Sequence, residues 1–471
     1  MSQADATGPA VAPPFDLGRP RRVHIVGVGG AGMSAIAAVL VAMGHHVSGS
    51  DLRSSPALER LAADGVAVAV GHDAANVPEG TELVAASTAI PPSNPEVRAA
   101  DERGIPVARR AEVLAAIAAT RRTVAVAGTH GKTTTSSMLA LVLIEAGASP
   151  SFIIGGDLNE IGSGSAWGDG ELLVVEADES DGTFLELPRR AAVITNVEPD
   201  HLEHYGGWHA LQAAFDRFAD ETDGPVVACA DDPGAAAMAA RVGAITYGTD
   251  PGARHRIVDV RSGRAGTTFG VTDGDRLLGE VHLPVAGLHN VRNAVAAVAM
   301  GLALDVPFEA AATALGRFGG VARRFEHRGE VAGVTFIDDY AHLPTEVAAA
   351  LAAAADGGWA RVVCVFQPHR YSRTEALGQD FADAFTGADL LAVTDVYSAG
   401  EAARPGVSGR LVVDAVLDAH PRARVAYLPH RADVLTWLLD VLRPGDLCLT
   451  LGAGDLTTAP GEVQRLLADR S

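Results

Sequence analysis

A glycine-rich segment that contains a lysine has the residue types needed to bind phosphate. It reads GTHGKTT at 128–134, follows the apolar run 123–127 and leads into a helical stretch. In such a loop the backbone N–H groups and the helix N-terminus cradle phosphates, the lysine reaches the terminal phosphates, and the next hydroxyl ligates Mg²⁺. The generic pattern has a glycine at the position that Val126 occupies here. In this chain the first glycine of the segment comes two residues later, at Gly128. The segment predicts a nucleoside triphosphate site formed by Gly128, Thr129, His130, Gly131, Lys132, Thr133 and Thr134.

Lys132 is the only lysine in the chain, beside 36 arginines. A bias toward arginine this strong indicates that arginine would not serve at the one position that kept lysine. Lysine offers a compact point charge, where the wide planar fork of arginine does not fit. The count therefore supports a phosphate-binding role for Lys132.

A second glycine-rich segment, GVGGAG at 27–32, follows the apolar run 22–26. It fits the dinucleotide fingerprint, and Asp51 stands close to the expected acidic position about 20 residues further on. Taken alone, it suggests an NAD-dependent dehydrogenase. The pattern itself requires only a pyrophosphate near a helix N-terminus, so any diphosphate-linked nucleotide satisfies it, and a tight turn without a ligand also remains open.

Acidic side chains follow two apolar runs downstream of the lysine loop. EADESD at 176–181 places four carboxylates in six residues, and Asp200 and His201 follow the run 192–195. Carboxylates at the carboxyl end of a strand beside a phosphate loop are placed to hold Mg²⁺. A solvated loop and a structural histidine are the alternatives for these two segments.

Three further segments carry candidate side chains. The first lies at the junction of two expected domains, and the other two follow expected strands. They are RRF at 323–325, DDYAHLP at 338–344 and QPHRYSRT at 367–374. An arginine at 323–324 can neutralise charge in phosphoryl transfer, or the two can be a surface pair. The arginines at 370 and 373 suit an anionic substrate, whose carboxylate they can bind in a bidentate manner.

These segments lie on a repeated alternation of short β-rich runs and helical stretches, which predicts parallel sheets covered by helices. The alternation restarts near residues 22, 123 and 325, and a more polar stretch at 253–283 predicts antiparallel strands. We expect an α/β chain of three domains after a flexible tail at 1–20. The expected domains are 21–120, Rossmann-like; 121–324, a central P-loop ATPase-type parallel-sheet domain; and 325–471, Rossmann-like.

Composition narrows the class of protein. The 471 residues carry a net charge of −21 and are 48% hydrophobic and 20% charged, which is typical of a globular chain with large cores. Such negative charge argues against nucleic acid and anionic lipid as partners. Three isolated cysteines, with no signal-peptide pattern and no apolar run of about 18 residues, predict a cytoplasmic protein with free thiols and no membrane span.

Taken together, these motifs resemble those of the Mur ligases, and most closely those of the members that add alanine. The resemblance runs from about residue 22 to the C-terminus, and the order of the motifs is the family's. In addition to the segments above they include GVGGAGMS at 27–34, TNVEPDH at 195–201, GLHNVRNA at 287–294, DVYSAGE at 395–401 and GAGD at 452–455. The first and the DVYSAGE segment look specific to the alanine-adding members.

The resemblance implies a domain for the UDP end of a sugar nucleotide, a central ATPase domain and a C-terminal domain that closes over the site. Catalytic roles would belong to Lys132, His201, Arg324 and His342. ATP would also contact His289, Asn290, Arg324 and Asp339, and Mg²⁺ would be held by Thr133, Glu176 and His201. The UDP-sugar would contact Gly27, Gly29, Gly30, Gly32, Met33, Ser34, Asp51, Ser87, Arg370 and Arg373, and the amino acid would contact Tyr397 and Glu401.

Two positions depart from the family pattern. Leu343 stands where the family commonly has a second histidine, so no catalytic role is expected there. Several relatives use a carbamoylated lysine near Mg²⁺, which is impossible here because Lys132 is the only lysine. Alanine-adding members are expected to manage without that group.

The activity implied is ATP-dependent joining of L-alanine to the lactyl carboxylate of UDP-N-acetylmuramate through an acyl phosphate, by a monomer or homodimer. Another amide ligase of this class, with a different amino acid or a peptide, is the near alternative. A nicotinamide-dependent oxidoreductase and a non-catalytic nucleotide switch are more distant.

Overall fold

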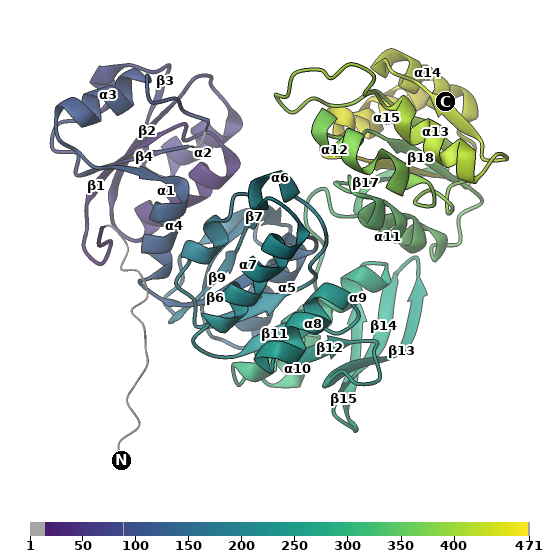
Figure 1. Cartoon of the computed structure of the whole chain (residues 1–471), viewed down its shortest axis with the longest axis horizontal. Helices are drawn as coiled ribbons and strands as arrows, with labels where there is room; N and C mark the ends of the chain where they lie inside the picture. The colour runs from purple at the N-terminus through teal and green to yellow at the C-terminus, as the bar shows by residue number, and fades with distance from the viewer. Residues whose placement is uncertain (1–14, 88, 470–471) are drawn as a thin grey trace. The chain divides into compact units, whose positions relative to one another are not determined.

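The computed structural model describes residues 15–87 and 89–469. Their strands form three sheets of five, ten and six strands, with helices between them (Figure 1). The chain divides into two compact units, one built mainly from residues up to 257 and the other mainly from residues 315–471. In the described part of the chain, no helix is long and apolar enough to span a membrane.

The first sheet is entirely parallel, in the order β3-β2-β1-β4-β5. Its strand order reverses between β1 and β4, which makes the carboxyl end of β1 a topological switch point, where α/β sheets bind ligands. The strands are β1 Arg22–Val26, β2 His46–Asp51, β3 Ala67–Val70, β4 Leu83–Ala86 and β5 Val107–Arg109. The helices are α1 Ala31–Ala42, α2 Pro56–Ala63, η1 Ala74–Asn76, α3 Pro95–Glu102 and α4 Arg110–Ala118.

The second sheet has the order β15-β14-β13-β12-β11-β10-β6-β9-β7-β8. Strands β7, β9, β6, β10, β11, β12 and β13 pair in parallel, and β8 is antiparallel to β7. The first strands along the chain are β6 Arg122–Ala127, β7 Ser151–Leu158, β8 Ser163–Ala166, β9 Leu172–Glu176 and β10 Ala191–Ile194. The others are β11 Val226–Cys229, β12 Ile245–Gly248, β13 His255–Gly263, β14 Gly266–Asp273 and β15 Arg276–Leu283.

Strand β6, which precedes the lysine loop, lies inside this sheet between β9 and β10. All of its residues after Arg122 are buried, as expected for a parallel strand covered on both faces. The helices of this region are α5 Lys132–Glu145, η2 Thr183–Glu186, α6 Leu202–Tyr205, α7 Trp208–Asp220, α8 Pro233–Val242, α9 Leu288–Ala303 and α10 Phe308–Leu315. The carboxyl ends of β6, β9 and β10 therefore bring the lysine loop and both acidic segments to one edge.

The third sheet has the order β16-β17-β21-β18-β19-β20, with only β16 antiparallel to its neighbour. Its strands are β16 Glu326–Val331, β17 Val334–Asp339, β18 Val362–Phe366, β19 Leu390–Val393, β20 Val425–Tyr427 and β21 Leu447–Leu451. Its helices are α11 Pro344–Ala355, α12 Tyr371–Leu377, η3 Gly378–Phe381, α13 Arg410–Ala419, α14 Arg431–Val441, η4 Asp455–Thr458 and α15 Ala459–Ala468.

Each face of the third sheet has its own core. Phe366 packs on one face with residues of α11 and α13, and Val365 packs on the other with residues of α14 and α15. This alternation follows from the two-residue period of a strand. The three parallel-rich sheets with covering helices confirm the predicted α/β class.

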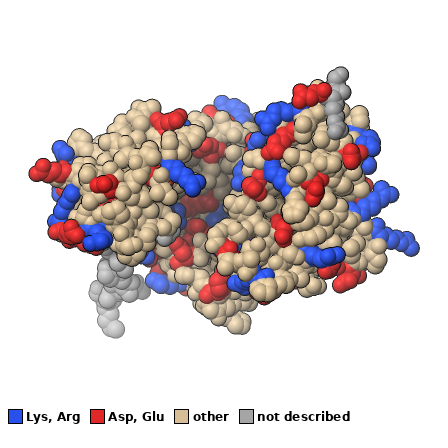
Figure 2. All heavy atoms as spheres, turned by 90° about the horizontal axis from the view of Figure 1, so that it is seen from above, with Lys and Arg blue, Asp and Glu red and all other residues tan. Residues whose placement is uncertain are grey.

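Two further sequence predictions concern the N-terminal tail and the stretch 253–283. The expected tail at 1–20 lies outside the described residues as far as residue 14, and Leu17 beyond it is buried. The stretch 253–283 forms the three consecutive strands β13, β14 and β15, which lie side by side in the sheet. On the surface, acidic and basic side chains are interspersed over the face shown in Figure 2.

Replacing Phe366 with alanine should destabilise the third sheet by about 3–5 kcal/mol, because it leaves a cavity in a packed core. Phe366 is fully buried, and its ring centroid lies 5.0 Å from that of Phe381 and 5.2 Å from that of Phe385. Urea unfolding followed by amide exchange in β18 measures the loss. Leu417→Ala, at an exposed position of α13, is the control and should change stability by less than about 0.5 kcal/mol. Equal stability of the two variants would contradict this packing.

Candidate active site

The lysine loop needs glycine at two positions. Gly128 has φ +133° and Gly131 has φ +79°, which L side chains rarely adopt. A Cβ on Gly128 would lie 2.1 Å from Thr195 Oγ1, and one on Gly131 would lie 2.5 Å from Asn293 Oδ1. The loop thus packs closely against two side chains, and its glycines provide the space for them.

Thr195 and Asn196, directly after β10, hold the loop through His130. The Thr195 hydroxyl donates to His130 O at 2.5 Å, and Asn196 Oδ1 accepts from His130 N at 2.8 Å. Helix α5 then begins at Lys132 with no side-chain cap. Its first N–H groups have no partner within the helix, so its N-terminus is a ready site for phosphate.

Lys132 carries a charge inside this loop. Its Nζ donates to Glu179 Oε2 at 2.7 Å and to Gly128 O at 2.6 Å. Burial alone would lower the pKa of Lys132, but the carboxylates of Glu179 and Asp178 raise it above the usual value. Lys132 is therefore protonated at neutral pH and is held over the loop by an acidic partner.

Thr133 and Glu176 place oxygen atoms beside the same helix N-terminus. Thr133 Oγ1 donates to Glu176 Oε1 at 3.1 Å, and Glu176 Oε2 accepts from Gly155 N at 2.8 Å. A hydroxyl and a carboxylate are suitable ligands for Mg²⁺, which usually takes one or two carboxylates together with substrate phosphates. Among the described residues no group of three or more His, Cys, Asp or Glu is arranged to hold a metal ion alone.

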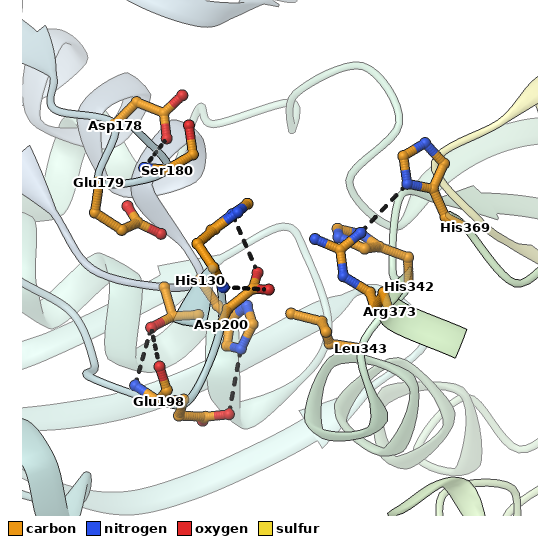
Figure 3. A network of polar contacts seen from close by, with 12 residues as sticks. His130, Asp178, Glu179, Ser180, Glu198, Asp200, His342, Leu343, His369 and Arg373 are labelled. Carbon is orange, nitrogen blue, oxygen red and sulfur yellow. Dashed lines mark hydrogen bonds and ion pairs between the residues drawn. The ribbon is translucent and has the colours of Figure 1, made fainter. Parts of the chain in front are cut away.

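More charged side chains surround the loop (Figure 3). His130 Nε2 lies 3.3 Å from Glu198 Oε2. His201 has φ +53°, and its Nε2 lies 3.3 Å from Asp200 Oδ2. The side chains of Asp178, Glu179, Glu198 and Asp200 make this edge of the second sheet strongly acidic.

The glycine-rich loop of the first sheet is also fixed by neighbouring strands. Gly27, with φ +79°, and Val28 donate their N–H groups to Ser50 O at 2.8 and 3.0 Å. The Asp51 carboxylate accepts from Gly29 N at 2.9 Å. Asp51 therefore contacts the loop itself and helps to hold it in place.

Helix α1 begins directly after this loop. Its N-cap residue Gly30 makes no side-chain cap hydrogen bond, so the first turn offers its N–H groups to an anion. In this turn Met33 is buried, and Ser34 Oγ donates back to Ala31 O. Ser87, at the end of β4, donates its N–H to Val26 O. The sequence-predicted UDP-sugar residues of the first sheet thus lie at one edge.

A buried carboxylate holds Ser50 in place. The hydroxyl of Ser50 donates to Glu96 Oε2 at 2.5 Å, and Asn76 Nδ2 donates to Glu96 Oε1 at 2.7 Å. Burial alone would raise the pKa of the fully buried Glu96, but hydrogen bonds from His24, Ser50 and Asn76 lower it to about 2. Sequence reasoning missed this group, because Glu96 looks like an ordinary acid in the first turn of α3.

Near the start of the third sheet, two arginines lie over the Tyr340 ring, with Cζ-to-centroid distances of 4.8 Å for Arg323 and 5.0 Å for Arg324. Arg323 donates to Gly452 O at 2.9 Å, which makes it a structural contact. Asp339 accepts N–H groups from Phe325 and Ala341 at 2.7 Å each, and burial raises its pKa to about 6.

His289 and Asn290, predicted to hold adenine, lie at the start of α9. Burial, together with the charges of Arg292 and Arg324, lowers the pKa of His289 to about 4, so His289 is neutral. Asn290 Nδ2 donates to Ala286 O at 2.7 Å. Because the charge of Arg324 acts on His289, two residues predicted to contact ATP lie near each other.

His342, His369 and Tyr397 form a chain of rings. The His342 and His369 centroids are 5.7 Å apart, and His369 stacks on Tyr397 at 5.6 Å with 12° between the planes. His369 Nδ1 lies 3.3 Å from Arg373 Nη1, a contact drawn in Figure 3. Burial, together with His342 and Arg373, lowers the pKa of His369 to about 4. His369 is therefore neutral and accepts a hydrogen bond from Arg373.

Arg370 and Glu401 complete this group. Arg370 has φ +70°, and its N–H donates to Tyr397 O at 2.8 Å. Glu401 accepts from the N–H and the hydroxyl of Ser372 at 2.9 and 2.6 Å. The residues predicted for the sugar carboxylate and the amino acid thus lie together at the carboxyl ends of β18 and β19, and Leu343 is buried at the start of α11.

Comparison with known proteins now gives the class. Three family models match: "Mur ligase family, catalytic domain" over residues 22–122, "Mur ligase middle domain" over 126–301, and "Mur ligase, glutamate ligase domain" over 323–454. The chain belongs to the Mur ligase family, as the motif resemblance predicted.

Within that family, two similar relatives and one solved structure carry the name of the same ligase. It is 49% identical to the UDP-N-acetylmuramate–L-alanine ligase of Acidothermus cellulolyticus, covering 94% of each chain. It is 48% identical to the ligase of the same name from Kineococcus radiotolerans, covering 98% of this chain and all of the relative. The crystal structure of UDP-N-acetylmuramate-alanine ligase from Thermotoga maritima has a TM-score of 0.79 and 29% identity, over 96% of this chain and 100% of that one.

Gly128→Ala should abolish ATP binding, with a loss of more than about 100-fold, because a Cβ would collide with Thr195 Oγ1 and displace the loop. Gly147→Ala is a matched control, since Gly147 also has positive φ, +73°, but has open space around it. It should cost about 1–2 kcal/mol of stability and leave ATP affinity unchanged. Calorimetric ATP titration of both variants checks this, and normal ATP affinity of Gly128→Ala would contradict the loop geometry.

Glu96→Gln should lower stability at neutral pH by up to about 3 kcal/mol, because one pKa unit corresponds to about 1.4 kcal/mol. The folded pKa of about 2 lies below the unfolded value of 4.5. The stabilisation by the ionised carboxylate is therefore complete above about pH 4.5 and is lost as the pH falls toward 2. Chemical unfolding of wild type and variant across this range tests it. A difference that does not depend on pH would show that Glu96 is not ionised when buried.

Proposed function

We propose that this chain is an ADP-forming ligase that joins L-alanine to the lactyl carboxylate of UDP-N-acetylmuramate in peptidoglycan precursor synthesis. The full-length similarity to ligases of that name supports the substrate assignment. The observation that carries the chemistry is the lysine loop, in which Lys132 is protonated above an uncapped helix N-terminus. This arrangement suits the terminal phosphates of ATP.

Binding of ATP requires Lys132 to change partners. Its ammonium group now pairs with Glu179 and Gly128 O, and a β- or γ-phosphate oxygen would replace these acceptors. The nearby carboxylates repel a triphosphate that carries no cation, so the nucleotide enters favourably only with a cation. These carboxylates are those of Asp178, Glu179, Glu198 and Asp200. Thr133, Glu176 and His201 would hold Mg²⁺. When bound, that ion would neutralise phosphate charge and fix the geometry of the γ-phosphate.

The reaction has two chemical steps. A lactyl carboxylate oxygen attacks the γ-phosphorus, the bond to the β-phosphate oxygen breaks, and ADP leaves with an acyl phosphate formed. The amino group of L-alanine then attacks the acyl carbon, loses a proton, and displaces inorganic phosphate as the amide forms. Lys132 and Arg324 would neutralise the charge on the transferred phosphate, and the side chain of His342 would lie near that phosphate.

The other substrates are assigned to the two remaining groups of residues. The sugar nucleotide would bind at the glycine-rich loop Gly27–Gly32, and Arg370 and Arg373 would bind its carboxylate in a bidentate manner. Tyr397 and Glu401 would contact L-alanine, Glu401 through the ammonium group. His289, Asn290 and Asp339 would contact ATP.

The remaining expectations belong to the same proposal. Domain boundaries near residues 120 and 324 would separate the sugar-nucleotide, ATP and C-terminal parts. The nucleotide-linked substrates place the reaction in the cytoplasm, with the protein a monomer or homodimer and without nucleic acid as a partner.

Phosphate release from Mg·ATP tests the function. We expect release to require UDP-N-acetylmuramate and to be fastest with L-alanine when glycine, L-serine, D-glutamate and no amino acid are compared. A faster rate with another amino acid would assign a different ligase of this class. Consumption of NADH with no phosphate release in any combination would overturn the proposal and restore the dehydrogenase interpretation of Gly27–Gly32.

Lys132→Ala should lower kcat by at least about 100-fold, because the charge on the transferred phosphate loses its fixed neutralising partner. Lys132→Arg should restore little, since a wide planar guanidinium group would replace the compact ammonium group that lies 2.6 Å from Gly128 O and 2.7 Å from Glu179 Oε2. Arg122→Ala is the matched control and should keep wild-type kcat. Arg122 is exposed at the start of β6, the strand that precedes the lysine loop. Near-normal turnover of a folded Lys132→Ala enzyme would refute the assignment.

A further inference from the structure

Arg110 lies against the first turn of α1, and neither the motifs nor the site described above uses it. A Cβ built on Gly32 would lie 3.0 Å from Arg110 Nη1 and 3.5 Å from its Cδ. The arginine side chain therefore runs along the face of Gly32 that a side chain would cover. Glycine at 32 leaves this space to the guanidinium group.

The start of α4 fixes the position of Arg110. Glu112 accepts from Arg109 N at 2.7 Å, in a capping-box arrangement that sets the first turn of this helix. The side chain of Arg109 binds Glu112 and Glu186, at 3.3 and 3.1 Å. By contrast, within residues 15–87 and 89–469, the half-buried Arg110 side chain makes no hydrogen bond or close ion pair, and its charge acts at longer range on Asp178, whose pKa it helps to lower.

The charges around the loop Gly27–Gly32 indicate which kind of ligand Arg110 can bind. The carboxylate of Asp51 lies 2.9 Å from Gly29 N, so the loop already carries negative charge close to α1. A diphosphate group adds more, and the N–H groups of one helix turn offset only about half a unit charge. A guanidinium beside the same turn offers planar paired donors that match phosphate oxygens.

We propose that Arg110 binds the diphosphate of the sugar nucleotide, together with the N–H groups of the first turn of α1. This inference rests on the proposed function, because it assigns a further residue to the same ligand. It also explains Gly32 physically: a side chain there would displace both the arginine and the phosphate.

Titration calorimetry without ATP tests the assignment, with UDP and UMP as probes. We expect Arg110→Ala to weaken UDP binding about 10- to 100-fold and UMP binding less, because UMP has one phosphate group fewer. Arg110→Lys should recover part of the loss, since it keeps the charge but not the paired donors. ATP affinity should stay at the wild-type value in both variants.

Arg98→Ala is the matched control, since Arg98 is an exposed arginine on α3 whose distance to Glu102 is 4.0 Å. It should bind UDP like the wild type. Equal UDP affinity of wild type and Arg110→Ala, or equal losses for UDP and UMP, would overturn the inference. If Arg110→Ala does not fold, Arg110→Gln replaces it with the same expected outcome. Failure of the wild-type protein to bind UDP at all would count against the proposed function instead.

Discussion

The pairing of Lys132 with Glu179 is the interaction on which the central site depends. A buried ammonium group is tolerated only when it has a partner, and here a carboxylate and a backbone carbonyl of the loop provide it. The chain as a whole carries a net charge of −21, so attraction of phosphate must come from a few fixed positive groups. The pairing with Glu179 keeps the ammonium group beside the loop, and in the proposed function a phosphate oxygen of the nucleotide would replace this carboxylate.

The two glycine-rich loops are each held in place by residues of a neighbouring segment, and these residues differ between the loops. In each, at least one glycine at positive φ shapes the turn that leads into a helix, and residues at the carboxyl end of an adjacent strand fix the loop. Thr195 and Asn196 do this for the lysine loop, and Asp51 with Ser50 for the first loop. Since adjacent parallel strands end at one edge, the sheet itself brings these partners together.

The residues after β18 and β19 are positioned by contacts between their side chains. Burial and nearby positive charges keep His369 neutral, which allows its Nδ1 to accept from Arg373. The stacking of His369 on Tyr397 holds this pair in position. A positively charged histidine there would repel Arg373, so neutrality of His369 is a condition for this hydrogen bond.

The sequence by itself determined the α/β class, the family and the two glycine-rich loops, because a strand, a glycine turn and a helix start are consecutive along the chain. Only the tertiary structure decided which distant side chains complete these loops. The contact of Asp51 with Gly29 N was not specified by the motif, and Asn293, Glu96, Arg110 and His369 received no role from the motifs. The physical reason is that such contacts depend on strand order and helix packing, which local spacing and periodicity do not specify.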